Sequence, residues 1–179
     1  MDWNAIALAA SVWVLPALLA ITLHEAAHGW VALKLGDDTA YRLGRVTFNP
    51  LRHVDPFGTV LLPAILIFSG SGFLFGWAKP VPVNFNRLRK PKRDMVWVAA
   101  AGPATNLALA IGSALGIHLI GLLPAPAGEW VGQNLLNSIR FNALLAVFNM
   151  IPLPPLDGGR VAVGLLPYGP ARALASIEP

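Results

Sequence analysis

Two histidines and a glutamate near the start of the sequence form the pattern H-E-x-x-H, as His24-Glu25-Ala26-Ala27-His28. Residues four apart share one face of a helix, so both imidazoles can bind the same metal ion. A glutamate directly after the first histidine can then act as a base toward a water at the metal. The motif lies in an apolar segment, where histidine and glutamate side chains are costly and therefore indicate a functional site.

The third metal ligand must come from another part of the chain, because a catalytic zinc takes three protein ligands and leaves one position for water. The sequence has no cysteine, which leaves His53, His118 or a carboxylate. Asp157 is the strongest candidate, since it follows the last apolar segment at the depth that His24 reaches in the first. A turn or helix-capping role is the alternative for Asp157. We therefore predict one tetrahedral Zn²⁺ per chain.

The composition is typical of a membrane protein. Of the 179 residues, 55% are hydrophobic and 12% are charged, and the mean hydropathy is +0.60. A single soluble core cannot hide that much apolar surface, so the excess must face lipid or other helices. The basic residues lie between apolar segments, which argues for a lipid bilayer and against nucleic acid as a partner. The apolar run from Ala5 to Leu23 is too long for a cleavable signal peptide and lacks a basic start.

The pattern along the chain predicts an all-α polytopic membrane protein with a small membrane-associated β element, as a single domain over residues 1–179. Three core transmembrane helices are expected at about residues 4–35, 95–123 and 134–151. Tyr41–Phe48 partly alternates between polar and apolar residues, which predicts a short strand pair. Residues 57–77 are apolar but contain Pro63 and several glycines, which suits a re-entrant segment or a shallow hairpin.

Lysine and arginine are concentrated in residues 34–56 and 77–94 and are absent from residues 121–133. The positive-inside rule places both basic segments in the cytoplasm and the N-terminus outside. A helix that spanned the membrane over residues 57–77 would put one basic segment on the wrong side. We therefore predict that this segment does not cross, and that the active site lies toward the cytoplasmic side.

Four further residues are candidates for the site. Asn106 and Asn149 are amides at membrane depth that could bind the scissile carbonyl or its oxyanion, or orient the glutamate base; helix–helix hydrogen bonding is the alternative. His53 precedes the re-entrant segment and could line a substrate cleft or serve as a structural histidine. Val46 lies in the predicted strand, whose edge could pair with an unwound substrate peptide.

Five motifs in order resemble the site-2 protease family of intramembrane zinc metalloproteases, and together they cover nearly the whole chain. The motifs are His24–His28, Asn49–Gly58, Gly76–Val83, Ala101–Asn106 and Asn149–Arg160. The chain looks most like the short bacterial or archaeal branch that has no inserted PDZ domain. The resemblance implies a prokaryotic cell membrane and one more membrane helix after the Glu178-Pro179 end of this sequence.

The resemblance also implies what the site residues do. Zinc is expected at His24, His28 and Asp157, with Glu25 as the base. The expected substrates are transmembrane segments of membrane proteins, often regulators such as anti-sigma factors, which are cut in regulated intramembrane proteolysis after a first protease has trimmed them. The oligomeric state is left open.

Two other functions are compatible with a metal site in a membrane. One is a zinc-binding transporter or sensor that does not hydrolyse anything, and the other is a catalytically inactive scaffold. Glu25 argues against both, because activation of water requires an acid beside the first ligand and transport does not. A transporter would also be expected to carry more intramembrane charges along its path than this sequence has.

Overall fold

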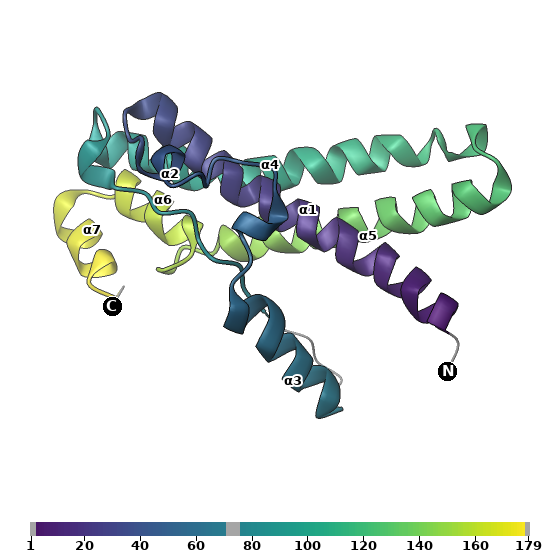
Figure 1. Ribbon diagram of the computed structural model, residues 1–179. Coiled ribbons are helices and arrows are strands. Elements are labelled where there is room, and N and C mark those ends of the chain that lie inside the picture. The colour runs from purple at the N-terminus through teal and green to yellow at the C-terminus, as the bar shows by residue number, and fades with distance from the viewer. Residues whose placement is uncertain (1–2, 71–75, 178–179) are drawn as a thin grey trace.

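Three long helices build the body of the protein. The computed structural model describes residues 3–70 and 76–177. Helices α1 (Trp3–Leu35), α4 (Pro91–Ile117) and α5 (Ala125–Asn149) pack against one another. Figure 1 shows α4 and α5 as an antiparallel hairpin, with α1 crossing beside them and with the two ends of the chain at opposite ends of the bundle.

Small residues line the contacts among these helices. Ala20 and Ala32 of α1 are completely buried, and Ala99 and Gly102 of α4 are also buried. Side chains of this size let helix backbones approach closely, which is the usual packing mode of helices in a membrane. The close approach of α1 and α4 brings the histidine motif directly against the α4 backbone.

The expectation of three core transmembrane helices is wrong. Among the described residues, two helices are long and apolar enough to cross a membrane, Ala10–Leu35 and Pro91–Ile117. The region predicted as a third span, residues 134–151, falls in α5, whose average hydropathy is lowered by polar residues along its length. These residues are Glu129, Gln133, Asn134, Asn137, Arg140 and Asn142. Two of them, Asn137 and Asn142, point into the bundle, where they hydrogen bond to α1 and α4 instead of facing lipid.

The predicted β element over Tyr41–Phe48 is also wrong, because the described part of the chain contains no strand. The region forms the short helix α2 (Thr39–Arg42) followed by turns. The Asp37 carboxylate accepts a hydrogen bond from the Thr39 backbone N–H, which starts the helical turn. A partial alternation over eight residues is too weak a pattern to outweigh this local hydrogen bond, and the described residues offer no neighbouring strand to pair with it.

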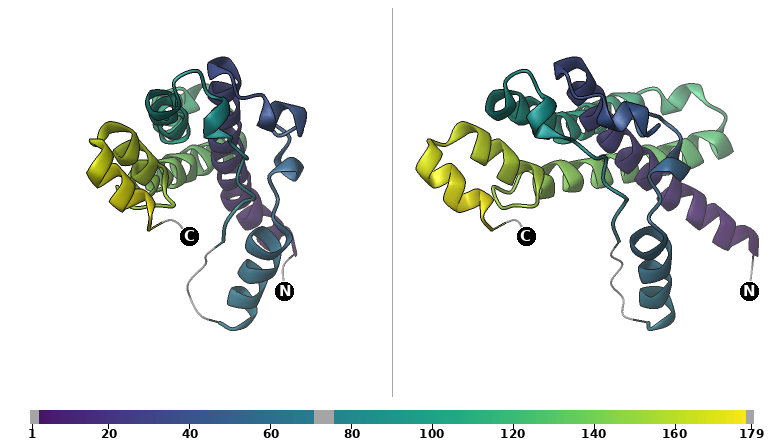
Figure 2. Two further views of the ribbon diagram at one scale, coloured as in Figure 1. Left: turned by 90° about the vertical axis from the view of Figure 1, so that its left-hand side faces the viewer. Right: turned by 60° about the vertical axis from the view of Figure 1, so that its left-hand side comes forward.

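The apolar segment after residue 56 leaves the bundle and returns to the same place. It begins with a π-helical turn, η2 (Pro56–Leu61), continues as α3 (Leu62–Phe68), and stands away from the long helices in both figures of the whole chain (Figures 1 and 2). The Trp77 N–H donates to the Gly58 carbonyl at 3.1 Å, and the Lys79 N–H donates to the His53 carbonyl at 2.9 Å. Residues 71–75 of the predicted re-entrant segment lie outside the described residues.

The remaining elements are short. Single 3₁₀ turns are present at η1 (Pro50–Arg52), η3 (Phe85–Arg87) and η4 (Ile120–Leu122). The chain ends with α6 (Asp157–Leu165), which packs on α4, and α7 (Tyr168–Ala175), which packs on α6. Asp157 is the first residue of α6, so the packing of α6 on α4 positions the Asp157 carboxylate beside the histidines of α1.

Candidate active site

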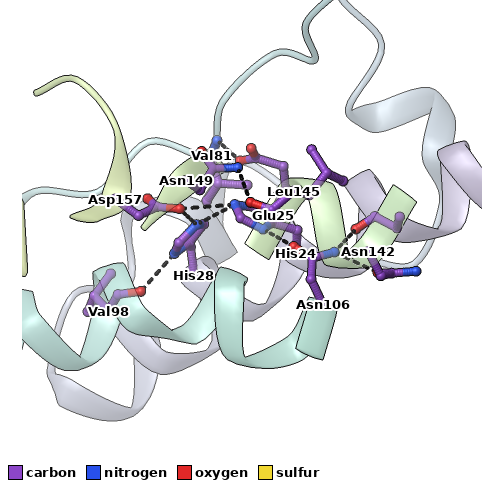
Figure 3. Close-up of polar contacts among 11 residues, drawn as sticks. His24, Glu25, His28, Val81, Val98, Asn106, Asn142, Leu145, Asn149 and Asp157 are labelled. Atoms are coloured by element: carbon purple, nitrogen blue, oxygen red, sulfur yellow. Dashed lines mark hydrogen bonds and ion pairs between the residues drawn. The ribbon is translucent and has the colours of Figure 1, made fainter. Parts of the chain in front are cut away.

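The three predicted metal ligands converge in the structure. His24 Nε2 and His28 Nε2 are 3.0 Å apart, and Asp157 Oδ2 lies 3.2 Å from the first and 3.4 Å from the second. Figure 3 shows the two rings of α1 meeting the carboxylate that arrives from α6. All three side chains are largely buried. Within the described residues, this is the group of histidine and acidic side chains placed to hold a metal ion.

Tight packing at two glycines places Asp157. A Cβ atom on Gly158 would lie 2.3 Å from the Met150 carbonyl oxygen, and a Cβ on Gly159 would lie 2.3 Å from the Pro154 nitrogen. Only glycine therefore lets the loop after α5 fold back onto the first turn of α6. The loop and the turn together direct the Asp157 carboxylate toward α1.

Hydrogen bonds at the far side of each imidazole decide which nitrogen carries the proton. His28 Nδ1 lies 2.7 Å from the Val98 carbonyl oxygen, and His24 Nδ1 lies 2.5 Å from the Asn106 side-chain oxygen. Both partners are acceptors, so both Nδ1 atoms must donate. Each Nε2 therefore presents a lone pair toward the other ring and toward the carboxylate.

This arrangement fits a cation at the centre of the three ligand atoms. Two lone pairs 3.0 Å apart beside a carboxylate repel one another unless positive charge lies between them. Asp157 Oδ2 is buried and accepts no hydrogen bond from the described residues. Ligand atoms about 2.0–2.1 Å from a tetrahedral zinc lie about 3.3–3.4 Å from one another. The two distances to Asp157, 3.2 and 3.4 Å, are close to that value, and the 3.0 Å between the two imidazole nitrogens is somewhat shorter.

Asp157 is ready to act as an anionic ligand. Burial raises the pKa of its carboxyl group, but the two imidazoles, whenever they donate a proton to the carboxylate or carry positive charge, outweigh burial and lower the pKa well below its usual range. The group is therefore ionised at neutral pH. An anionic oxygen and two neutral imidazoles form a ligand set that zinc prefers, and no thiolate is needed.

Gly102 of α4 forms the floor of the site. A Cβ atom at this position would lie 2.4 Å from His28 Nε2 and 2.6 Å from His24 Nε2. The two ligating atoms thus rest directly on the α4 backbone, where no larger residue leaves room for them. The sequence showed a glycine in a motif, but only the packing of α1 on α4 shows why that glycine is required.

Glu25 faces a different part of the molecule. It is half-buried, and its Oε2 accepts a hydrogen bond of 2.7 Å from the Val81 backbone N–H (Figure 3). The segment that carries Val81 is also held by Arg45, whose guanidinium donates to the Lys79 carbonyl at 2.6 Å. The carboxylate next to the first ligand is therefore oriented by a peptide group and is not itself in the ligand triangle.

Sequence comparisons identify relatives that share these features. The chain is 40% identical over 172 residues to YwhC of Bacillus subtilis, which covers 92% of this chain and 74% of YwhC. It is 33% identical over 141 residues to Rip2 of Mycolicibacterium smegmatis, which covers 79% of this chain and 52% of Rip2. Both relatives are named "Putative zinc metalloprotease". The chain belongs to the site-2 protease family.

Membership in the site-2 protease family confirms the predicted activity class and cofactor. The protein is a zinc metalloendopeptidase of a membrane. A shorter match, 39% identical over 64 residues, is to MJ0611 of the archaeon Methanocaldococcus jannaschii and covers 36% of this chain and 31% of that protein. No family model matches the chain, and no solved structure matches it.

The predicted amides occupy different positions. Asn106 is completely buried beneath His24, and its amide group bonds to other parts of the bundle. Asn149 is half-buried at the end of α5, where its Nδ2 donates to the Leu145 carbonyl at 3.0 Å. Figure 3 includes both among the polar residues of the site. Their parts in catalysis remain predictions.

The two predicted substrate-binding residues also differ. His53 is 2% exposed, and its Nε2 lies 3.1 Å from the Thr47 carbonyl oxygen. This contact stabilises the loop between residues 47 and 53. Val46 is half-buried and lines a cleft of about 510 Å³ against α1. The other residues of the cleft are Leu23, Ala26, Ala27, Trp30, Thr47, Phe48 and Thr105. Only Val46 is thus placed on an accessible surface, and a role in substrate binding remains a prediction for both.

Asn142 belongs to the site and was not among the predicted residues. It is 1% exposed and contacts Asn106, which in turn contacts the first metal ligand. The available signal was its spacing, because Asn142 precedes Asn149 by two helical turns and therefore lies on the same face of α5.

Proposed function

We propose that this protein is an intramembrane endopeptidase that cuts transmembrane segments of other membrane proteins. The observation that carries the proposal is the position of the ligand triangle on a helix that can span a bilayer. At about 1.5 Å per residue, His24 lies about 21 Å from Ala10 and about 16 Å from Leu35 along that helix. A peptide bond that reaches this site must therefore lie within the apolar layer or at its edge.

The residues of the site support hydrolysis by an activated water. His24, His28 and Asp157 would hold zinc, which when bound acts as a Lewis acid and makes water a nucleophile near neutral pH. The Glu25 carboxylate takes a proton from the attacking water as the new carbon–oxygen bond forms. It then gives that proton to the amine nitrogen as the carbon–nitrogen bond breaks. The hydrogen bond from the Val81 N–H to Oε2 fixes the orientation of the Glu25 carboxylate.

The substrate must be extended when it is cut. A helical peptide hides its carbonyl groups in internal hydrogen bonds, so a transmembrane helix has to unwind locally before water can attack. The cleft beside Val46 and Phe48 offers an apolar surface on the motif helix for such a segment. Regulated intramembrane proteolysis of a membrane-bound regulator, such as an anti-sigma factor, is the process that this chemistry would serve.

We place the N-terminus outside a prokaryotic cell membrane and the active site toward the cytoplasm. Basic residues flank the segment 57–77 on both sides, and hydrogen bonds join Gly58 to Trp77 and His53 to Lys79. A segment whose two ends meet in this way enters and leaves the membrane on one side. The relatives come from bacteria and an archaeon, which supports a prokaryotic membrane.

Cysteine labelling tests this orientation. Because the sequence has no native cysteine, only the introduced cysteine can react with the reagent. Arg52→Cys and Arg89→Cys, at two exposed positions, should both react with an impermeant reagent from the cytoplasmic side. Leu122→Cys, whose parent side chain is 81% exposed, should react from the outside. Labelling of Arg52→Cys and Arg89→Cys from opposite faces would mean that the intervening segment crosses.

A zinc-binding transporter or sensor is the alternative function. The relatives bear protease names, and Glu25 stands next to a ligand without joining the ligand set, which favours hydrolysis. The deciding experiment is cleavage of a model transmembrane peptide by the purified protein in detergent. Cleavage should stop with a chelator and return with added zinc. Peptide that stays intact in the presence of one bound zinc per chain would support the transporter or sensor.

A further inference from the structure

We propose that Asn142 is a positioning residue for the metal centre. It acts through Asn106 to hold His24 in the tautomer and ring orientation that present Nε2 to zinc. The inference rests on the proposed ligand set, and it assigns a function in the site to α5, which contributes no ligand. Figure 3 shows the chain of contacts from Asn142 through Asn106 to His24.

The hydrogen bonds of Asn106 to Ala20 and Asn142 fix the orientation of its amide group, so that the amide oxygen faces His24. Its Nδ2 donates to the Ala20 carbonyl at 3.2 Å and to Asn142 Oδ1 at 2.7 Å. Both partners are acceptors, so the amide nitrogen must point toward them and the amide oxygen toward His24. The shorter of the two bonds is the one to Asn142, which makes Asn142 the stronger constraint on the amide.

Asn142 is in turn held by its own helix. Its Nδ2 donates to the Ser138 carbonyl at 2.9 Å and to the Ser138 hydroxyl at 3.2 Å. The Ser113 hydroxyl on α4 donates to the Ser138 hydroxyl at 2.8 Å. With its nitrogen directed at Ser138, Asn142 has only its oxygen to present to Asn106. The donor-to-acceptor order therefore runs from His24 through Asn106 and Asn142 to Ser138, which also accepts from Ser113.

The consequence concerns the proton on His24. If Asn142 loses its oxygen, only the longer bond to the Ala20 carbonyl still holds the Asn106 nitrogen, and rotation of the amide can turn its NH₂ group toward His24 Nδ1. His24 would then have to accept at Nδ1 and carry its proton on Nε2, where the proton blocks the metal. Partners that orient a ligating histidine typically change metal affinity by about 10–100-fold when they are removed.

The test is zinc affinity, measured by competition with a chromogenic chelator on the full chain in detergent. Asn142→Leu should bind zinc about 10–100-fold more weakly than the parent protein. Asn142→Asp keeps an oxygen for Asn106 and should stay within about threefold of the parent affinity. The matched control is Asn137→Leu, because Asn137 is also a buried asparagine of α5 that donates to an α1 carbonyl, at 2.7 Å, but no hydrogen bond among the described residues connects it to a metal ligand.

The unfolding temperature of the metal-free protein separates positioning from packing. Asn142→Leu and Asn137→Leu should lower it by similar amounts, whereas only Asn142→Leu should weaken zinc binding. Equal zinc affinities in these two variants would overturn the proposal, as would equal losses in Asn142→Leu and Asn142→Asp. The Asp variant keeps the test decisive even where the Leu variant does not fold.

A double-mutant cycle tests the route through Asn106. If Asn142 acts only through that amide, adding Asn142→Leu to Asn106→Leu should change zinc affinity no further. Additive effects would show that Asn142 acts by another route and would refute the relay. His28→Ala separates this outcome from failure of the ligand set, because unchanged zinc binding there would overturn the proposed site itself, whatever the Asn142 variants do.

Discussion

The two sides of the active site are built in different ways. On the side facing α4, the two imidazoles rest on Gly102 and are hydrogen bonded to a backbone carbonyl and a buried amide. On the side facing the segment around Val81, a half-buried Glu25 is held by one peptide N–H. The first side is closed and fully packed, and the second is more open. Metal binding and proton transfer should therefore be separable by mutation.

The largest effect is expected from removal of the carboxylate ligand. Asp157→Ala should lose zinc and with it all turnover, because two imidazoles remain where three ligands are needed. Metal analysis of the purified protein checks this, with about one zinc per chain expected for the parent protein. Asp38→Ala is the matched control, since Asp38 is paired with Arg42 and Arg87 away from the site. Full zinc content in Asp157→Ala would remove Asp157 from the ligand set.

Glu25→Gln should separate the two sides most clearly. The amide has nearly the same shape but cannot take a proton, so turnover of a model peptide should fall by about 10²–10⁴-fold. Zinc content should not change, because Glu25 lies outside the ligand triangle. Substantial activity in this variant would mean that another group serves as the base.

Asn149→Ala should reduce turnover by about 10²–10³-fold if the amide donates to the developing oxyanion. Zinc content should again be unchanged, which would place Asn149 with Glu25 on the open side. Parallel losses of zinc and turnover would instead assign Asn149 to the packing of the loop that leads to Asp157. Measuring kcat and zinc content on the same preparation distinguishes the two results.

Gly102→Ala probes the closed side and should weaken zinc binding by about 10–100-fold, in the range seen when the support of a ligating histidine is disturbed. The added methyl group would lie within 2.6 Å of both Nε2 atoms, so the rings must shift. Gly112→Ala is the control on the same helix, because a Cβ there meets nothing within 4 Å. Equal zinc affinities in the two variants would mean that the rings can move away without loss of the metal.

Some of this site could be predicted without a structure. The spacing of His24, Glu25 and His28 guarantees a shared helical face, and apolar composition alone indicates that α1 and α4 can cross a membrane. Both predictions rest on information that is local in the chain. The prediction of a strand pair at Tyr41–Phe48 was wrong because the alternation was weak and the local hydrogen bond from the Thr39 N–H to Asp37 favoured a helical turn.

Other features were decided by tertiary structure. The prediction that α5 spans the membrane was wrong because polar side chains lower the mean hydropathy of this helix. Two of these side chains bond to other helices, and the sequence does not show in which direction a polar side chain points. The proton positions on the two imidazoles depend on the Val98 carbonyl and on Asn106. Every residue has a backbone carbonyl, so the sequence does not show which carbonyl will accept the hydrogen bond from His28.

The amino-acid sequence by itself determined that this protein has a metal motif in an apolar helix, because helical periodicity and hydropathy act over a few neighbouring residues. The sequence also pointed to Asp157 as the third ligand. Tertiary structure alone decided the distances of 3.2 and 3.4 Å at which Asp157 meets the histidines, that Gly102 must be small, and that Asn142 reaches the first ligand through Asn106. These relations join residues far apart in the chain. They exist only once α1, α4, α5 and α6 have packed, because packing is what sets the distance between side chains that the sequence keeps apart.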